Sequence, residues 1–423
     1  MIACGLDFGT SNSGVALPAR GGVRLVPLED GATSMPTAVF FGTEEPLVTL
    51  YGRAAVSEYL DGTPGRLMRS LKSLLGSGLM EETTAVGDRN IRYTDIVTLY
   101  LRTLRTRASE AADATLDTVV LGRPVRFVDD DAAADGLAQD TLAACAREAG
   151  FRHIEFQLEP IAAALDYERT IAREEVVLVI DVGGGTADFS LLRVAPERGA
   201  RIDRTADVLA NDGIHIAGTD FDTRLNLAWI MPALGYGATG PHGKPVPSLV
   251  YFDLSTWHRI NFLYTPRFSG ALRELQAFFD DPLPYRRLAR VIERKLGHQL
   301  LGQTEQAKIE LSAAPRTLID LREIERGLAV PARQSELLAL LERLLARLVE
   351  VGRATVRAAG LRERDVATLY FTGGSSGMTA LRAAFEKAFP ASAVTVGDLF
   401  GSVVSGLGLD AGRRFGPGGT AAA

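Results

Sequence analysis

The chain has 423 residues, of which 46% are hydrophobic and 23% are charged. This length exceeds what one simple hydrophobic core organises, so it predicts two lobes with inserted subdomains, and the composition is that of a globular protein. The formal net charge of −6 at pH 7 gives no reason to expect nucleic-acid binding.

Cysteine content and apolar runs exclude further classes of protein. Cys4 lies in a predicted strand and Cys145 on a predicted helix face, so we expect buried thiols and neither a disulfide framework nor a zinc site. No apolar run approaches the length of a membrane span, and the chain does not open on a signal segment. The sequence therefore predicts a cytoplasmic protein without a membrane partner.

The chain opens on a strand, a polar turn and a second strand. Residues 2–6 are apolar, Asp7 follows where this strand should emerge, and residues 14–17 form the partner strand. The turn offers a glycine and hydroxyl groups, which suit phosphate oxygens. Its candidate phosphate-binding residues are Gly9, Thr10, Ser11 and Asn12.

Helical patterns follow this first turn. Residues 54–59 and 66–75 predict short helices, and Lys72 lies in the second of them. A lone lysine on a helix is usually solvated, so its position alone assigns no role. Apolar spacing next predicts a helix, a strand and another helix at residues 93–112, 118–121 and 135–149.

Glu159 lies between a predicted strand and a predicted helix. The strand covers residues 154–158, and Pro160 takes the first position of a helix that runs to residue 169. A carboxylate is stabilised at a helix N-terminus, so capping alone would explain Glu159.

The middle of the chain repeats the strand–turn–strand pattern of its start. Residues 176–180 read as a strand buried on both faces, and Asp181 follows it. The turn then contributes glycine amides, a hydroxyl and a second carboxylate, from Gly183, Gly184, Gly185, Thr186 and Asp188. Glycine amides suit phosphate, and two carboxylates suit a hydrated Mg²⁺ ion, although an ordinary hairpin would also contain a glycine turn. Two such units indicate an internal duplication whose lobes enclose a nucleotide.

The second half alternates helices with one more glycine turn. A segment containing Gly218 leads into a helix, and residues 249–268 give no clear pattern. Residues 287–313 predict one helix with Glu305, Lys308 and Ser312 on one face. A strand over residues 366–371 precedes a turn with Gly373, Gly374 and Ser375, which faces a helix N-terminus.

Together these segments resemble, in order, the ATPase domain of the DnaK-like heat shock protein 70 family, within the actin-like ATPase superfamily. The matching segments are residues 5–13, Lys72-Ser73-Leu74-Leu75-Gly76, Glu159-Pro160, Asp181 to Asp188, Gly218 to Asp222, Glu305 to Ser312, and Gly373 to Ser375. The resemblance implies an α/β fold of the actin-like, duplicated ribonuclease H-like type, with two lobes that each hold a mixed sheet flanked by helices.

The resemblance also implies a division of the chain. Lobe I would span residues 1–175 with an inserted subdomain at about 39–115, and lobe II residues 176–392 with one at about 231–313. Residues 393–412 would return to lobe I, and residues 413–423 would be a disordered tail. No linker or peptide-binding domain is expected, so the pattern is most similar to stand-alone members of the family.

Site roles carry over from the matching motifs. The resemblance implies ATP or ADP with Mg²⁺, the ion held through water by Asp7, Asp181 and Asp188. Lys72 would neutralise the γ-phosphate, Glu159 and Asp181 would orient the attacking water, and Thr186 would contact the γ-phosphate. The N-terminal turn and the central turn would cradle the phosphates. The adenosine would be held by Gly218, Glu305, Lys308, Ser312 and residues 373–375.

Three functions remain open at this point. The first is an ATP-binding, ATP-hydrolysing chaperone-like protein with a client or regulatory protein as partner. The others are a small-molecule kinase of the same superfamily and a nucleotide-dependent regulatory or filament-forming module. One departure bears on the choice: Arg126 stands where the family pattern usually has a tyrosine, so the catalytic centre looks retained but the relay to a second domain does not.

Overall fold

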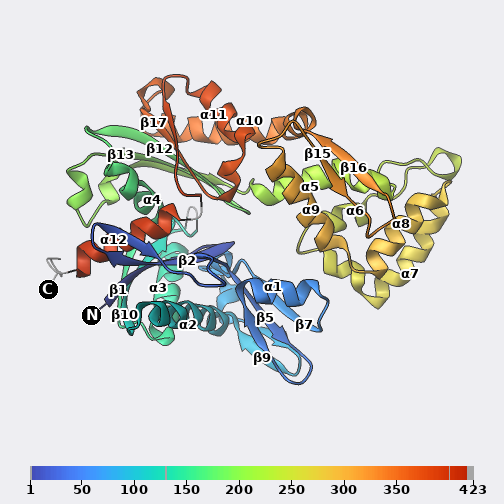
Figure 1. Cartoon of the computed structure of the whole chain (residues 1–423), viewed down its shortest axis with the longest axis horizontal. Helices are drawn as coiled ribbons and strands as arrows, with labels where there is room; N and C mark the ends of the chain where they lie inside the picture. The colour runs from blue at the N-terminus through green and yellow to red at the C-terminus, as the bar shows by residue number, and fades with distance from the viewer. Residues whose placement is uncertain (1, 129–130, 400, 417–423) are drawn as a thin grey trace.

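A computed structural model gives the structure of residues 2–128, 131–399 and 401–416 (Figure 1). The first lobe is built on a mixed sheet in which β1 pairs in parallel with β10 and antiparallel with β2. Its strand order is β11-β10-β1-β2-β3, with β4 also paired to β2. The strands are β1 (Ile2–Phe8), β2 (Asn12–Ala19), β3 (Gly22–Leu25), β4 (Ser34–Pro36), β10 (Leu116–Arg123) and β11 (His153–Leu158).

The second lobe repeats this pattern. Its sheet has the order β14-β13-β12-β17-β18, and β12 pairs antiparallel with β13 and in parallel with β17. The strands are β12 (Glu175–Val182), β13 (Ala187–Val194), β14 (Val208–Ile214), β17 (Thr368–Thr372) and β18 (Ala393–Val396). Two mixed sheets that start on equivalent hairpins, each flanked by helices, confirm the predicted fold class.

Helices cover both sheets and cross between them. In lobe I, α2 (Tyr93–Ala112) packs on α3 (Ala132–Ala149). Between the sheets, α12 (Ser402–Phe415) packs on β1 and β2, and α4 (Glu159–Glu168) packs on α12, β12 and β13 (Figure 1). Lobe II adds α5 (Gly218–Trp229), α10 (Gln334–Ala358) and α11 (Thr379–Ala388).

Each lobe carries an insert, and both inserts extend to the same side of the molecule (Figure 1). The first consists of β5 (Ala38–Gly42), β6 (Thr49–Tyr51), α1 (Gly52–Leu60), β7 (Gly65–Arg69), β8 (Thr83–Val86) and β9 (Arg89–Arg92). The second consists of α6 (Leu249–Leu254), α7 (Pro266–Leu275), α8 (Pro282–Glu293), α9 (Gly297–Glu310), β15 (Arg316–Asp320) and β16 (Ala329–Arg333).

The largest apolar cores belong to separate lobes. One gathers buried side chains between Cys4 and Phe151, and the other gathers buried side chains between Leu178 and Phe389. Separate cores are expected of units that can move relative to each other. The lobe boundaries themselves stay a prediction.

Two predicted helices are wrong. Residues 65–69 form strand β7, because they pair along their whole length with β5 in a three-stranded sheet, and a 3₁₀ turn at Leu71–Leu74 follows. The predicted helix over residues 287–313 is broken between α8 and α9, where Lys295 takes a left-handed conformation with φ of 56°.

The C-terminal end also differs in part from expectation. Helix α12 continues to Phe415, so residues 413–415 are ordered in a helix and not in a tail. Phe415 packs on an apolar cluster and Arg414 pairs with Asp410 and Glu155, which explains the continuation. Residues 417–423 of the predicted tail lie outside the described residues. Within the described part of the chain, helices long and apolar enough to cross a membrane are absent.

Candidate functional site

The turn after β1 is closed tightly by its own backbone and by Thr37. A Cβ atom on Gly9 would lie 2.1 Å from the carbonyl oxygen of Asn12, so only glycine fits this turn. The buried Thr37 hydroxyl donates to the Gly9 carbonyl at 2.7 Å, and the Thr37 amide donates to the Ser11 carbonyl at 2.9 Å. These bonds leave the turn pre-shaped at the end of β1, directly after Asp7.

Asp7, Glu159 and Lys72 meet beside Gly122 at the end of β10. A Cβ atom on Gly122 would lie 3.2 Å from Glu159 Cγ and 3.5 Å from Asp7 Oδ1, which shows how closely both carboxylates approach it. Lys72 Nζ forms an ion pair with Glu159 Oε1. Glu159 therefore does more than cap α4, and Lys72 is not a solvated lysine, since its side chain is only 9% exposed.

Electrostatics in this cluster favour a charged lysine and disfavour charged acids. Burial opposes the charge on Lys72, but Glu159, Asp7 and Asp188 outweigh it and raise the pKa of the ammonium. Burial, together with repulsion by Glu159, raises the pKa of Asp7 to about 7, although Lys72 works in the other direction. The cluster therefore contains more acids than its one lysine can neutralise, and Asp7 keeps a proton more readily than an ordinary aspartate.

The central hairpin places its two aspartates side by side. Asp181 on β12 pairs directly with Asp188 on β13, so both side chains lie on the same face of the sheet. Thr186 Oγ1 donates to Asp188 Oδ2 at 3.1 Å. Burial raises the pKa of Asp181 to about 8, with further contributions from Asp188, Glu159 and Asp7. Carboxylates from both lobes thus form one electrostatic unit.

The glycine turns of the two lobes face each other. A Cβ atom on Gly184 would lie 2.8 Å from Ser11 Oγ of the first turn. Gly183 is anchored from behind, because its carbonyl accepts from the Gly218 amide at 3.1 Å and from Ser375 Oγ at 2.8 Å. The predicted phosphate residues of both lobes are therefore brought together, with Gly218 and Ser375 supporting the second turn.

Gly373 is required at its position for two reasons. Its φ of +81° is strained for other residues, and a Cβ atom there would lie 2.3 Å from Asp181 Oδ1. Gly374 follows at the start of a 3₁₀ turn, Gly374–Gly377. The third glycine turn thus packs against Asp181 as well as against the second turn.

Helix α9 and the turn after it contribute the remaining predicted residues, with Glu305 and Lys308 in α9 and Ser312 two residues beyond its end. Lys308 Nζ pairs with Asp222 Oδ1 at 2.7 Å, which ties α9 to α5, the helix that begins at Gly218. Burial raises the pKa of Asp222 to about 6, against the effect of Lys308. Thr379 Oγ1 donates to the carbonyl of Ser312 at 3.2 Å, and Glu305 is exposed. Lys308, already paired with Asp222, and Ser312 thus contact elements that adjoin Gly218 and the Gly374–Gly377 turn.

Residues of both lobes also border a small cavity. It has a volume of about 30 Å³, and Glu159, Asp181, Asp188 and Thr372 are among its lining residues. A space of this size holds one or two water molecules. Among residues 2–128, 131–399 and 401–416, no three acidic, histidine or cysteine side chains are grouped closely enough to bind a metal ion by themselves. A hydrated ion, as predicted, does not need such a group.

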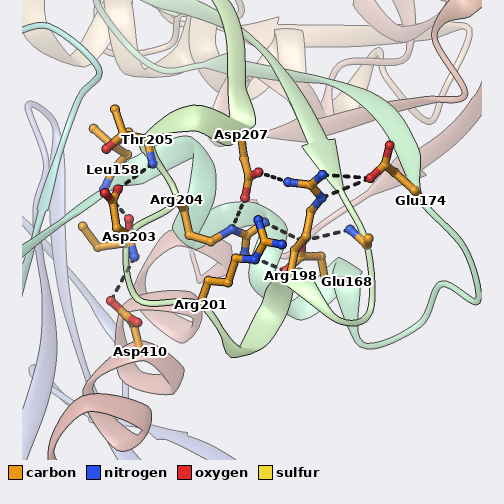
Figure 2. Close-up of polar contacts among 12 residues, drawn as sticks. Leu158, Glu168, Glu174, Arg198, Arg201, Asp203, Arg204, Thr205, Asp207 and Asp410 are labelled. Carbon is orange, nitrogen blue, oxygen red and sulfur yellow. Dashed lines mark hydrogen bonds and ion pairs between the residues drawn. The ribbon is translucent and has the colours of Figure 1, made fainter. Parts of the chain in front are cut away.

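A buried ionic network fixes the far end of α4 (Figure 2). Arg204, whose side chain is 1% exposed, pairs with both oxygens of Glu168 at the end of α4 and with Asp207. Arg198 joins Asp207 to Glu174. Glu159 and Glu168 occupy the two ends of this helix, so the network holds the helix that positions Glu159.

Sequence reasoning missed three residues that shape the site. Thr37 closes the first turn, Gly122 admits two carboxylates, and Asp222 holds Lys308. Asp222 lay within a recognised segment without an assigned role. Thr37 and Gly122 carry no local signal, because their partners are distant in the sequence.

Comparison with known proteins gives one family. The family model described as Hsp70 protein matches residues 74–232. The "Chaperone protein HscA homolog" of Chromobacterium violaceum is 29% identical over 260 residues, which are 57% of this chain and 39% of that protein. The "Chaperone protein HscA" of Salmonella agona is 31% identical over 240 residues, 52% of this chain and 36% of that protein. The matched part thus covers well under half the length of these relatives.

Proposed function

Because the chain belongs to the Hsp70 family, whose fold is that of the actin-like ATPases, we propose that it binds Mg-ATP between its lobes in the cytoplasm and hydrolyses it. The observation that supports this most is the meeting of Asp7, Lys72, Glu159, Asp181 and Asp188 where the glycine turns of the lobes face each other. Turn amides suit phosphate oxygens, and the adjacent excess of carboxylates suits a cation.

The residues would act mainly by positioning and charge neutralisation, as phosphoryl transfer requires. The amides of residues 9–12 and 183–185 cradle the phosphates, and Thr186 contacts the γ-phosphate. Lys72 turns from Glu159 toward the charge that develops on the γ-phosphate. Glu159 and Asp181 orient the attacking water and accept its proton. The nearby cavity supports this role, because both residues line it and its volume is large enough for a water molecule.

Mg²⁺ fits the donor set, because Asp7, Asp181 and Asp188 offer hard oxygen ligands, and because burial and then repulsion between the carboxylates raise the pKa of Asp7 and Asp181, which a cation would offset. When bound, the ion would neutralise phosphate charge. The three carboxylates would hold it as a hydrated ion. Opposite the phosphates, Glu305, Lys308 and Ser312 meet the adenosine beside Gly373, Gly374 and Ser375.

A chaperone role is the coarser part of the proposal. Family membership supports it, and the partner would be a client or regulatory protein. The matched relatives are named as chaperones, and the part of them that aligns here covers 36–39% of their length. Client binding therefore stands as a proposal for this chain.

Conservative variants distinguish residues that are needed for ATP hydrolysis from residues that are needed for ATP binding. Thermal unfolding with Mg-ATP should show a higher melting temperature by mass action, and no shift with saturating ATP or ADP would refute nucleotide binding. In single-turnover assays, Glu159→Gln, Asp181→Asn and Lys72→Ala should slow hydrolysis by roughly 10²–10³-fold while binding changes little. Glu44→Gln, at an exposed acid, is the control. If all variants hydrolyse ATP like the parent, the catalytic roles are wrong. Tight binding without hydrolysis in the parent would favour a regulatory module.

A further inference from the structure

The two inserts touch through a cluster of aromatic rings. Tyr59 on α1 stacks on Trp257, which follows α6, with ring centroids 5.6 Å apart and an interplanar angle of 27°. His298 on α9 packs edge-on against both rings, at 5.2 Å from Tyr59 and 4.7 Å from Trp257. Figure 1 shows α1 facing α9 on the side where the inserts extend. The rings therefore join lobe I to lobe II away from the crossing helices.

Arg69 adds a cation to this contact. Its guanidinium carbon lies 4.5 Å from the ring centroid of Trp257, the geometry of a cation–π interaction. Arg69 comes from β7 of the first insert and is also attracted by Glu305 on α9. The first insert thus holds the second by a stacked ring and by a charge over an aromatic face.

His298 fits this cluster as a neutral ring. It is 7% exposed, and its Nε2–H donates to the carbonyl oxygen of Trp257 at 3.2 Å. Burial lowers its pKa to about 4, and Arg69 contributes in the same direction. The other groups that face it are the phenol of Tyr59 from α1 and that of Tyr264, which accepts the amide of Gly297 at 2.9 Å.

A second cation lies close to the same contact. Lys295 precedes α9, and its Nζ lies 3.7 Å from the Cβ position of Gly62 in the first insert. A charged His298 would therefore join Arg69 and Lys295 in a region where the inserts meet. Charging the ring would add repulsion among like charges and require a buried cation.

We propose that Tyr59, Arg69, Trp257 and His298 form a clasp that closes the inserts over the nucleotide, and that a proton on His298 opens the clasp and speeds nucleotide release. The clasp itself stands on the ring contacts, and its effect on release rests on the proposed function. His298 and Glu305 lie on one helix, seven residues and about 10 Å apart along its axis. Opening the clasp would thus carry the adenosine-binding helix away from lobe I.

The size of the effect follows from linkage. An opened His298 would regain its ordinary pKa near 6.5, whereas the clasped ring has a pKa of about 4. Opening is then unaffected by pH above about 7, and at pH 5 it becomes favoured by roughly 30-fold. If opening limits release, the release rate of bound nucleotide should rise by a similar factor.

Two measurements on the full chain test the proposal. The first is stopped-flow release of a fluorescent ADP analogue between pH 8 and pH 5. His298→Gln keeps a hydrogen-bond donor for the Trp257 carbonyl but cannot be charged. Asp7 and Asp181 also titrate between pH 8 and pH 5, so the test is the difference between the variants: the release rate of His298→Gln should rise roughly 30-fold less than that of the parent. His153→Gln, at an exposed histidine on β11, should behave like the parent.

The second measurement needs no nucleotide. The chain has two tryptophans, Trp229 and Trp257, and Trp229 is buried in lobe II. Acrylamide quenching of tryptophan fluorescence therefore reports the clasp through Trp257, and Trp257→Phe identifies its share of the quenching. This share should increase at pH 5 in the parent but not in His298→Gln. Tyr59→Ala should raise quenching and release at pH 8. Equal pH dependence of quenching in the parent and His298→Gln would overturn the clasp. If no nucleotide binds, only the proposed function fails, since quenching still tests the clasp.

Discussion

Replacing Lys72 and Glu159 one at a time tests whether the lysine of the carboxylate cluster contributes more to the stability of the folded protein than a single acid does. Lys72→Met removes the ammonium that Glu159, Asp7 and Asp188 all attract. Glu159→Gln removes one of these carboxylates and keeps the shape of the side chain. We therefore expect Lys72→Met to lower the free energy of unfolding far more than Glu159→Gln.

The magnitudes follow from burial. The side chains of Lys72 and Glu159 are 9% and 18% exposed. Removing one partner of a buried ion pair lowers the free energy of unfolding by roughly 3–5 kcal/mol. Because Glu159 is partly exposed, we expect the lower end, about 3 kcal/mol, for Lys72→Met. Glu159→Gln should cost about 1 kcal/mol or less, because Lys72 keeps Asp7 and Asp188 and because Glu159 no longer repels Asp7 and Asp181.

The assay is urea unfolding followed by circular dichroism, without nucleotide and with a chelator present. Midpoints and slopes are compared among the parent, both single variants and the double variant. The double variant should be more stable than Lys72→Met alone, since Glu159 is then no longer an unpaired charge. Lys244→Met, at an exposed lysine, controls for loss of a charge. Equal costs for the two single variants, or a larger cost for Glu159→Gln, would refute this account of the cluster.

Two further predictions use matched glycines. Gly373→Ala should lower the free energy of unfolding by about 1–3 kcal/mol more than Gly327→Ala does. Both glycines have φ near +80°, but only at Gly373 would a Cβ meet Asp181. Equal urea midpoints of the two variants would contradict this. Gly184→Ala should weaken nucleotide binding by about tenfold in calorimetry, since its Cβ would meet Ser11. Gly136→Ala on α3, where a Cβ has open space outside the phosphate turns, should bind like the parent.

Local patterns predicted the elements that frame the site. The apolar stripe of residues 93–112 matches α2 in both bounds, because one face of that helix is fully buried. Asp181 and Asp188 flank a glycine turn in a hairpin, and hairpin pairing alone places them on one face. The predicted fold class is confirmed for the same reason, since both lobes begin on such a hairpin.

Contacts between segments that are distant in the sequence could not be predicted from local sequence patterns. Lys72 and Glu159 are 87 residues apart, and only the family resemblance suggested a shared role. Residues 66–75 have a helical pattern, but pairing with β5 converts their first half into a strand. Trp257 lies in a segment without a clear pattern, and its partners Tyr59 and His298 come from other elements. Long-range packing decides such positions, and local propensity does not.

The distribution of charge suggests how the proposed nucleotide would change the lobes. Asp7 and Glu159 stand on one side of the site and Asp181 and Asp188 on the other. Ionising all four carboxylates would leave about three negative charges beside Lys72, and this repulsion, added to burial, keeps protons on Asp7 and Asp181 near neutral pH. A cation with its nucleotide would replace this repulsion by attraction and release protons from the acids whose pKa is raised. At the opposite end the aromatic clasp favours contact between the inserts. Closure at the phosphates therefore depends on the ligand, and closure at the inserts depends on neutral His298.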